Sequence, residues 1–387
     1  MNKKITLGLA ISLIAVSVAV TFILTSFFSL QSFNKKVIDV NERAKKYSAL
    51  QTLDNFVREN YYGDINEENL EDSILKGYVN GIGDKYSRYL TEDEYLTELN
   101  DNSGSLVGLG LTLTEDESGY VRISEILSGS PAQESGVEAE DIIIRVDGVD
   151  VKDMGFAESL DALKGTEGSS VTLTIRRNGS DKDYSFTRRA IQVTTVEAEM
   201  LGNMVGYIKI TGFKENTPEQ FIDAMERMTV NGAQSLIFDL RDNTGGLVTA
   251  LSDCLDPLLP EGVVATAEYS DGHSETLIYS DESELNMPMA VIVNSNTASA
   301  AELFAASLHD FGKAVIVGEQ TYGKGVMQDI TEFDDGGAVV LTVAKYQTAY
   351  SPCYDGIGLI PDYPVENDDP DVDAQFNKAV ELVTFQG

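Results

Sequence analysis

Apolar residues follow several patterns along the chain, and the first predicts a membrane segment. Residues 5–30 carry no charge, and a helix of that length, at about 1.5 Å per residue, would span roughly 39 Å. The apolar part of a secretory signal is usually about 7–15 residues long and ends at a small-x-small cleavage site, which favours an uncleaved anchor here over a signal peptide. We expect a transmembrane signal-anchor over residues 1–30, a polar juxtamembrane linker over 31–47, and the remainder of the chain outside the cell.

The next segment has helical periodicity. Leu70, Ile74 and Tyr78 recur at the spacing of one helix face. Thr91 and Glu94 form the T-x-x-E pattern of a capping box, which marks the start of a further helix. We expect a small helical region over residues 48–101.

Short β-rich runs replace the helical pattern from residue 102 onward. Runs such as "YVRISEIL" and "DIIIRVDGVDV" are separated by Gly, Asp-Gly and Ser-Pro turns. Between the runs, "SPAQESG" and "GFAESLDALKG" have the composition of two short helices. These elements predict a small domain over residues 102–190.

Strands and helices then alternate over residues 191–387. "NMVGYIKI" predicts a strand, "TPEQFIDAMERMTVNG" a helix and "AQSLIFDLRD" a buried strand, and "VMQDITEF" with "AVVLTVAKYQT" predicts a hairpin. Such alternation favours an α/β core with a mostly parallel sheet and helices on both faces. Functional sites in these folds gather where strand C-termini meet helix N-termini.

Charge and cysteine content exclude several functions. The chain has 63 acidic and 28 basic side chains, a formal net charge of −35. This charge repels phosphate backbones, so we expect no nucleic-acid partner. Cys254 and Cys353 lack metal-ligand spacing, so we expect no metal. An extracellular location would permit a disulfide between them, and buried free thiols are the alternative.

Ser299, in "NTASAAELF", has two possible roles. With Glu302 it forms an S-x-x-E capping box, but a serine at a helix start can also be a nucleophile if a base takes its proton. His309 lies ten residues further along the same predicted helix, about 15 Å away, and His273 sits in a polar turn. A Ser-His-Asp triad is therefore disfavoured.

Lys324, between two glycines in "GEQTYGKGVMQ", is the other candidate base. Burial lowers the pKa of a lysine and makes its neutral amine available. Because a Gly-Lys-Gly sequence is usually a solvated loop, this observation carries little weight without the other motifs.

Residues 102–190 resemble a PDZ domain. "ILSGSPAQESGVEAEDIIIRVDGVDV" follows the PDZ order of helix, Asp-rich turn and apolar strand, and "VGLGLTL" stands where these domains bind a peptide carboxylate through backbone N–H groups. The resemblance implies that Leu109, Gly110 and Leu111 contact a ligand. An ordinary turn leading into a strand is the alternative.

The ordered set of "DNTGG", "TASAAE" and "YGKGVMQ" behind the PDZ-like segment resembles the C-terminal processing peptidases, also called tail-specific proteases. The resemblance covers about residues 50–387 and implies a ClpP/crotonase-like α/β serine protease core with an inserted PDZ domain and no cofactor. It places Ser299 on the nucleophile, Lys324 on the base, and Gln328 on the glutamine that holds the base. Thr244, Thr297, Ala301 and Tyr322 depart from the commonest motifs without removing a reacting group, and Lys164 stands where many relatives have arginine.

The backbone N–H groups of Gly245, Gly246 and Ala300 are candidates for an oxyanion hole, because the glycines follow a strand and begin a helix. Asp310, at the end of the Ser299 helix, is expected to have a structural role.

The resemblance further implies protein substrates with apolar C-termini and a homodimer. Two other functions remain open: a catalytically silent membrane-anchored PDZ binding protein, and a Ser-Lys hydrolase of small amides or esters.

Overall fold

The computed structural model describes residues 44–45, 47–334, 336–369 and 371–384. The chain divides at Ile74 and Leu75 into two units, which are considered separately. In the first unit, residues 47–60 are helical and Arg58 pairs with Asp54 and Glu67. Glu67 also begins α2 (Glu67–Asn80), which continues into the second unit.

The predicted membrane segment over residues 1–30 lies outside the described residues, and among those described no helix is long and apolar enough to cross a membrane.

A short helical segment precedes the PDZ-like domain in the second unit. Helix α3 (Glu92–Asn102) begins after Thr91, whose hydroxyl accepts a hydrogen bond from the Glu94 N–H while the Glu94 carboxylate accepts one from the Thr91 N–H. The predicted capping box is therefore confirmed. The helix extends one residue past the expected boundary at residue 101.

The PDZ-like domain is built on an antiparallel sheet with the strand order β3-β4-β5-β7-β8, and β6 pairs with β5. The two predicted helices are present as α4 and α6, and a buried apolar cluster that includes Val121, Ile143 and Leu173 forms the core. Strand β3 has no neighbour on its outer side within the described residues. The elements are β3 (Leu111–Glu115), β4 (Val121–Ile126), α4 (Pro131–Ser135), β5 (Ile142–Val146), β6 (Val149–Asp150), α5 (Val151–Met154), α6 (Phe156–Leu163), β7 (Ser170–Arg177) and β8 (Ser180–Thr187).

A two-stranded sheet marks the entry to and exit from this domain. Strand β2 (Ser105–Gly108) pairs antiparallel with β9 (Arg189–Gln192). The chain thus leaves the PDZ-like domain beside the point where it entered, as expected for a domain inserted into a larger protein.

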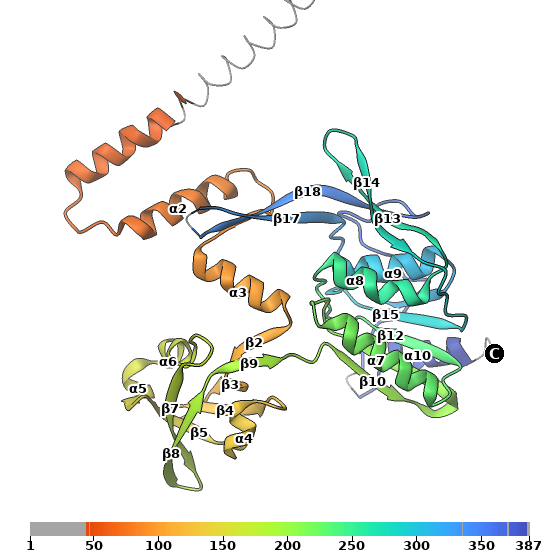
Figure 1. Ribbon diagram of the computed structural model, residues 1–387, viewed down its shortest axis with the longest axis horizontal. Helices are drawn as coiled ribbons and strands as arrows, with labels where there is room; N and C mark the ends of the chain where they lie inside the picture. Colours follow the sequence, from red (N-terminus) through yellow and green to blue (C-terminus); the bar gives the residue numbers. More distant parts are fainter. Residues whose placement is uncertain (1–43, 46, 335, 370, 385–387) are drawn as a thin grey trace, which may run out of the picture. The chain divides into compact units, whose positions relative to one another are not determined.

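The central sheet of the C-terminal domain lies between two layers of helices (Figure 1). Alternate residues of β12 face opposite layers: Leu236 and Phe238 pack with α7, α8 and α9, whereas Ile237 packs with α10. The strands in spatial order are β10 (Val196–Met200), β11 (Val205–Ile210), β12 (Ser235–Asp239), β15 (Met289–Val293), β16 (Ala314–Gly318) and β19 (Tyr363–Pro364). The helices are α7 (Thr217–Val230), α8 (Val248–Leu255), α9 (Ala300–Asp310) and α10 (Ala374–Thr384).

The expectation of a mostly parallel core holds for one sheet and is wrong for the domain as a whole. In the central sheet β11, β12, β15, β16 and β19 run parallel, and only β10 is antiparallel to its neighbour. A second sheet is antiparallel throughout the described residues; two of its strand pairs are hairpins, and its other pairings join segments far apart in the sequence. It contains β1 (Arg88–Leu90), β13 (Gly262–Tyr269), β14 (Ser274–Ser280), β17 (Val326–Glu332) and β18 (Ala338–Thr348), and β17 and β18 form the predicted hairpin (Figure 1).

Candidate active site

Ser299 stands between β15 and α9, at the kind of strand-to-helix junction that the sequence predicted. It is the N-cap of α9, and its backbone has a φ of 56° and a ψ of −120°. A positive φ is rare for a residue with a side chain, costs on the order of 1–3 kcal/mol, and occurs most often at functional sites. The side chain is nearly buried, with 5% of the residue exposed. Ser299 therefore has a backbone conformation that capping alone does not require.

Glu302 joins the start of α9 to the loop that carries Lys324. Its carboxylate is fully buried and accepts hydrogen bonds at Oε2 from the backbone N–H groups of Ser299 at 2.9 Å and Lys324 at 2.8 Å. At Oε1 it accepts from the Thr321 hydroxyl at 2.5 Å and the Gly323 N–H at 2.8 Å. A buried carboxylate requires such partners because it has lost its hydration. Glu302 thus holds the candidate nucleophile and the candidate base in one network, beyond the capping role predicted for it.

Lys324 has the electrostatic environment expected of a base. Burial lowers the pKa of its amine, and the positive charge of Arg88 lowers it further, while Glu98, Asp84 and Glu302 act in the opposite direction. The net effect is a pKa below the usual value for lysine. A larger share of the amine is therefore neutral near pH 7 than in a solvated lysine.

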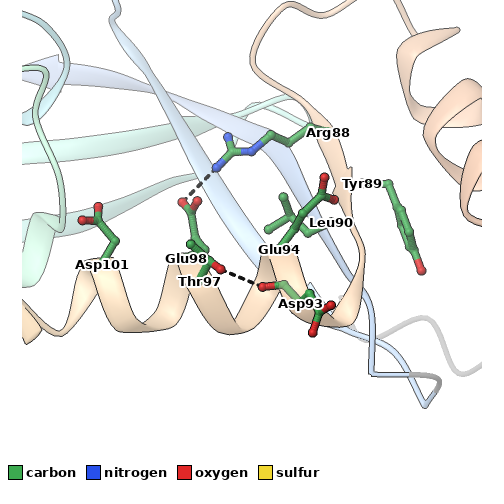
Figure 2. Close-up of a pocket in the computed structure, with 8 residues that line it drawn as sticks. All are labelled: Arg88, Tyr89, Leu90, Asp93, Glu94, Thr97, Glu98 and Asp101. Atoms are coloured by element: carbon green, nitrogen blue, oxygen red, sulfur yellow. Dashed lines mark hydrogen bonds and ion pairs between the residues drawn. The ribbon is translucent and has the colours of Figure 1, made fainter. Parts of the chain in front are cut away.

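Arg88 lines a pocket between β1 and α3 (Figure 2). Its guanidinium forms an ion pair with Glu98 on α3 at 2.8 Å. Arg88 and Glu98 are therefore adjacent and have opposite effects on the pKa of Lys324: Arg88 lowers it and Glu98 raises it.

Gln328 is on β17 but does not have the contact predicted for it. Its Nε2 donates to the Val326 carbonyl at 3.3 Å and to the Thr342 hydroxyl at 3.3 Å. The prediction assumed an extended strand from Lys324 to Gln328, but β17 begins only at Val326 and has an irregular register between Met327 and Gln328. A role in orienting Lys324 stays a prediction.

The backbone next to Ser299 is formed by Gly245. Its φ is 105°, and a Cβ added there would lie 2.8 Å from the Ser299 Cβ and 3.0 Å from the Ala300 nitrogen. Its own N–H donates to the Asn243 side chain at 2.8 Å. Helix α8 begins only at Val248, so the glycines precede the helix rather than begin it. Among the three predicted oxyanion donors, Gly245 thus already has a partner, and Gly246 and Ala300 stay candidates.

Two tyrosines that sequence reasoning missed lie at Ser299. Burial raises the pKa of Tyr346 to about 12, and a hydrogen bond with the Ser299 side chain acts in the opposite direction. The Tyr354 hydroxyl donates to the Ser299 carbonyl at 3.4 Å. Neither residue stands in a motif, and Tyr346 in a β-rich run looks like an ordinary core residue.

The other residues considered in the sequence analysis lie outside the candidate active site and have structural roles or lie at the surface. Asp310 accepts hydrogen bonds from the N–H groups of Tyr350 and Ser351 at 2.9 and 3.0 Å and from the Ser351 hydroxyl, which matches the predicted structural role. His309 pairs with Asp362 and His273 with Asp271.

Cys254 is buried and Cys353 partly buried, and both are free, so the disulfide alternative is wrong and the thiol alternative holds. The described residues contain no group of three or more His, Cys, Asp or Glu arranged to bind a metal.

A groove in the PDZ-like domain runs between β3 and α6. Leu109, Gly110 and Leu111 line it on one side, and Leu160 and Leu163 on the other. At Gly110 φ is 75°, and an added Cβ would lie 2.2 Å from the Ser130 Cβ, so the turn requires glycine. With the outer edge of β3 unpaired in the described residues, the groove has the geometry to accept an extended peptide as an added strand.

Lys164 also borders this groove. It follows α6, is largely exposed, and pairs with Asp161 at 2.7 Å. An exposed ion pair of this kind contributes little to stability.

Comparison with known proteins agrees with this geometry. The family model of peptidase family S41 matches residues 204–365, and that of the PDZ domain matches residues 98–176. The carboxy-terminal processing protease CtpA of Bacillus subtilis is 34% identical over 323 residues, which cover 83% of this chain and 69% of that protein. A carboxyl-terminal-processing protease of Synechocystis is 32% identical over 317 residues, covering 78% and 74%. Among solved structures, a photosystem II D1 C-terminal processing protease is similar with a TM-score of 0.50 and 26% identity, covering 86% of this chain and 90% of that one.

Fold and site together define a serine hydrolase with a peptide-binding module. The chain belongs to peptidase family S41, and it is a serine-type C-terminal processing endopeptidase with a PDZ domain. The expected family and enzyme class are therefore confirmed, and neither the catalytically silent binding protein nor the hydrolase of small amides or esters is supported.

Proposed function

We propose that this peptidase is anchored in the cell membrane by residues 1–30, acts on the extracytoplasmic side, and cleaves proteins by a Ser299–Lys324 mechanism. The observation that carries the mechanism is the Glu302 network, in which one carboxylate oxygen accepts the backbone N–H of both residues. A scaffold without catalysis would not require a strained serine and a lysine with a lowered pKa in one buried network.

Catalysis begins with proton transfer from the Ser299 hydroxyl to the neutral amine of Lys324. The Ser299 oxygen attacks the peptide carbonyl, and the Lys324 ammonium returns the proton to the leaving amine as the peptide bond breaks. A water molecule then gives a proton to Lys324 and attacks the acyl-enzyme ester; as the ester bond breaks, Lys324 returns the proton to the Ser299 oxygen, which releases the new C-terminus and restores both residues. The lowering of the Lys324 pKa by burial and Arg88 favours both transfers, because it makes the amine a weaker base than an ordinary lysine.

The tetrahedral intermediates require donors for their oxyanion. We assign this role to the N–H groups of Gly246 and Ala300, and to that of Gly245 if it exchanges its hydrogen bond with Asn243 for the oxyanion. The close approach of Gly245 to Ser299 supports this assignment. Gln328 would hold Lys324 only after its side chain leaves Thr342.

Substrates are proposed to dock by their C-termini in the PDZ groove. Apolar C-terminal side chains match the leucines at 109, 111, 160 and 163, and the backbone near Gly110 supplies donors for the terminal carboxylate. The charge of −35 argues against nucleic-acid partners. By the resemblance to its family, the chain would act as a homodimer without a cofactor.

The experiment uses the full chain in detergent with an unfolded protein that ends in apolar residues. We expect cleavage, labelling of Ser299 by a fluorophosphonate, and loss of cleavage in both Ser299→Ala and Lys324→Ala. Cleavage surviving in both variants would contradict the proposed mechanism. Absence of cleavage and labelling in the unaltered chain would favour the silent binding protein, and turnover of small esters without any protein cleavage would favour the small-molecule hydrolase.

A further inference from the structure

Tyr86 lies in the segment between α2 and β1, far in sequence from Ser299 and Lys324, yet its aromatic ring is close to the candidate base. The Nζ atom of Lys324 lies over the ring, 5.0 Å from its centroid. We propose that Tyr86 is a positioning residue for Lys324: its ring holds the amine in place and stabilises the ammonium that forms when Lys324 takes the Ser299 proton. This inference rests on the proposed role of Lys324 as the base.

Hydrogen bonds and strand pairing connect the residues next to Tyr86 to the protease core. Asp84 accepts the Tyr86 N–H at 3.3 Å and the Ser87 hydroxyl at 2.5 Å. The Ser87 oxygen in turn accepts the N–H of Thr342 on β18 at 3.1 Å. Directly afterwards, Arg88 pairs with Val340 as β1 joins the antiparallel sheet. The backbone that carries the ring is therefore held by hydrogen bonds to β18, whose Thr342 also contacts Gln328.

The ring, rather than the hydroxyl, is the functional part of Tyr86. Its buried hydroxyl has no hydrogen bond of good geometry among the described residues, although Lys85 and Tyr322 interact with it electrostatically. The aromatic face, by contrast, attracts cations, since Lys85 also lies over it at 4.6 Å. A cation over an aromatic face is stabilised electrostatically, whereas a neutral amine is not. The contact therefore strengthens as Lys324 becomes protonated during attack.

Other titratable groups also act on Lys324 and on Tyr86. Around Lys324 they are Arg88, Glu98, Asp84 and Glu302, and around Tyr86 they are Lys85 and Tyr322. Because a change confined to the ring electrons leaves all of them in place, it isolates the effect of the ring.

The test replaces Tyr86 in the full chain with phenylalanine and then with phenylalanines carrying one, two and three ring fluorines, which weaken the cation attraction at nearly constant shape. Tyr86→Phe is the reference with which each fluorinated variant is compared. Cation attraction of this kind corresponds to about 2- to 30-fold in rate, so kcat should fall stepwise within that range with fluorination. The acid limb of the kcat/KM profile should move stepwise to lower pH, because the ammonium loses stabilisation. A purely structural role would not produce this graded shift.

Tyr120 provides a matched control, because Lys152 Nζ lies over its ring at 4.2 Å in the PDZ domain. The same fluorinated series at Tyr120 should leave the pH profile unchanged. A flat response at position 86, or a fall in kcat with an unmoved acid limb, would overturn the inference. If Lys324→Ala retains activity, the proposed mechanism fails as well. If Lys324→Ala is inactive while the series at 86 is flat, only the role of Tyr86 is wrong.

Discussion

Ser299 and Lys324, 25 residues apart in the sequence, donate their backbone N–H groups to the same oxygen atom, Glu302 Oε2, at 2.9 and 2.8 Å. The backbone segments that carry the two side chains therefore cannot move independently of each other. A catalytic pair requires such constraint, because a misplacement of about 1 Å can cost roughly 100-fold in rate.

Replacing Glu302 with glutamine should lower kcat/KM by about 100-fold and reduce the free energy of unfolding by about 1–3 kcal/mol. An amide can accept at one end only, so two of the four donors would face an NH2 group instead of an oxygen. Steady-state kinetics and denaturant unfolding measure the two effects. Glu332→Gln, at an exposed site on β17, is the control and should change neither. An unchanged Glu302→Gln enzyme would show that the network does not position the pair.

The charges at Arg88 and Glu98 should shift the pH profile in opposite directions. Activity needs neutral Lys324, so it rises with pH through the pKa of this residue, which burial and Arg88 lower and Glu98 raises. Arg88→Gln should therefore move the acid limb of kcat/KM to higher pH, and Glu98→Gln should move it to lower pH. Because both substitutions break the same ion pair, its loss cannot by itself explain opposite shifts. Shifts of the same sign in both variants would contradict this assignment of the acid limb to Lys324.

Gly245→Ala should abolish most activity. Its Cβ would lie 2.8 Å from the Ser299 Cβ, so the nucleophile or the oxyanion backbone must move, and losing one oxyanion donor alone typically costs about 10²–10³ in kcat. Gly272→Ala is the control, because that residue also has a positive φ, of 86°, but open space around its Cβ. This control should lose about 1 kcal/mol of stability and keep its kcat. Equal kcat in the two variants would show that the approach of Gly245 to Ser299 has no catalytic role.

Local geometry alone left the roles of Ser299 and Lys324 open, and the ordered motifs with their family resemblance predicted them as nucleophile and base. Ser299 stands at a helix start and Lys324 in a glycine-flanked turn, and both lie in one buried network. Gln328 shows where local reasoning fails. Its predicted orientation assumed a regular strand, but the strand begins after Lys324 and is irregular at Gln328.

Long-range contacts account for what the sequence did not reveal. Tyr86, Tyr346 and Tyr354 come to the site from separate segments, and a tyrosine in a β-rich run has the same appearance whether it packs in a core or against a nucleophile. The antiparallel second sheet was missed for a similar reason, since only its two hairpins, β13–β14 and β17–β18, are local. Its other pairings join distant segments: β13 and β18 are about 80 residues apart in the sequence, and Arg88 and Val340 about 250.

The PDZ groove gives a prediction that separates docking from chemistry. Leu160→Glu would place a negative charge among the leucines that line the groove, where it would repel a terminal carboxylate and weaken apolar contacts. We expect KM for a protein with an apolar C-terminus to rise about tenfold or more, with little change in turnover of a short peptide whose C-terminus is amidated. Val149→Glu is the control, because Val149 is exposed on β6 and does not line the groove. If the groove instead gates the active site, both substrates should lose kcat in Leu160→Glu. An unaltered KM for the protein substrate would show that its C-terminus is bound elsewhere.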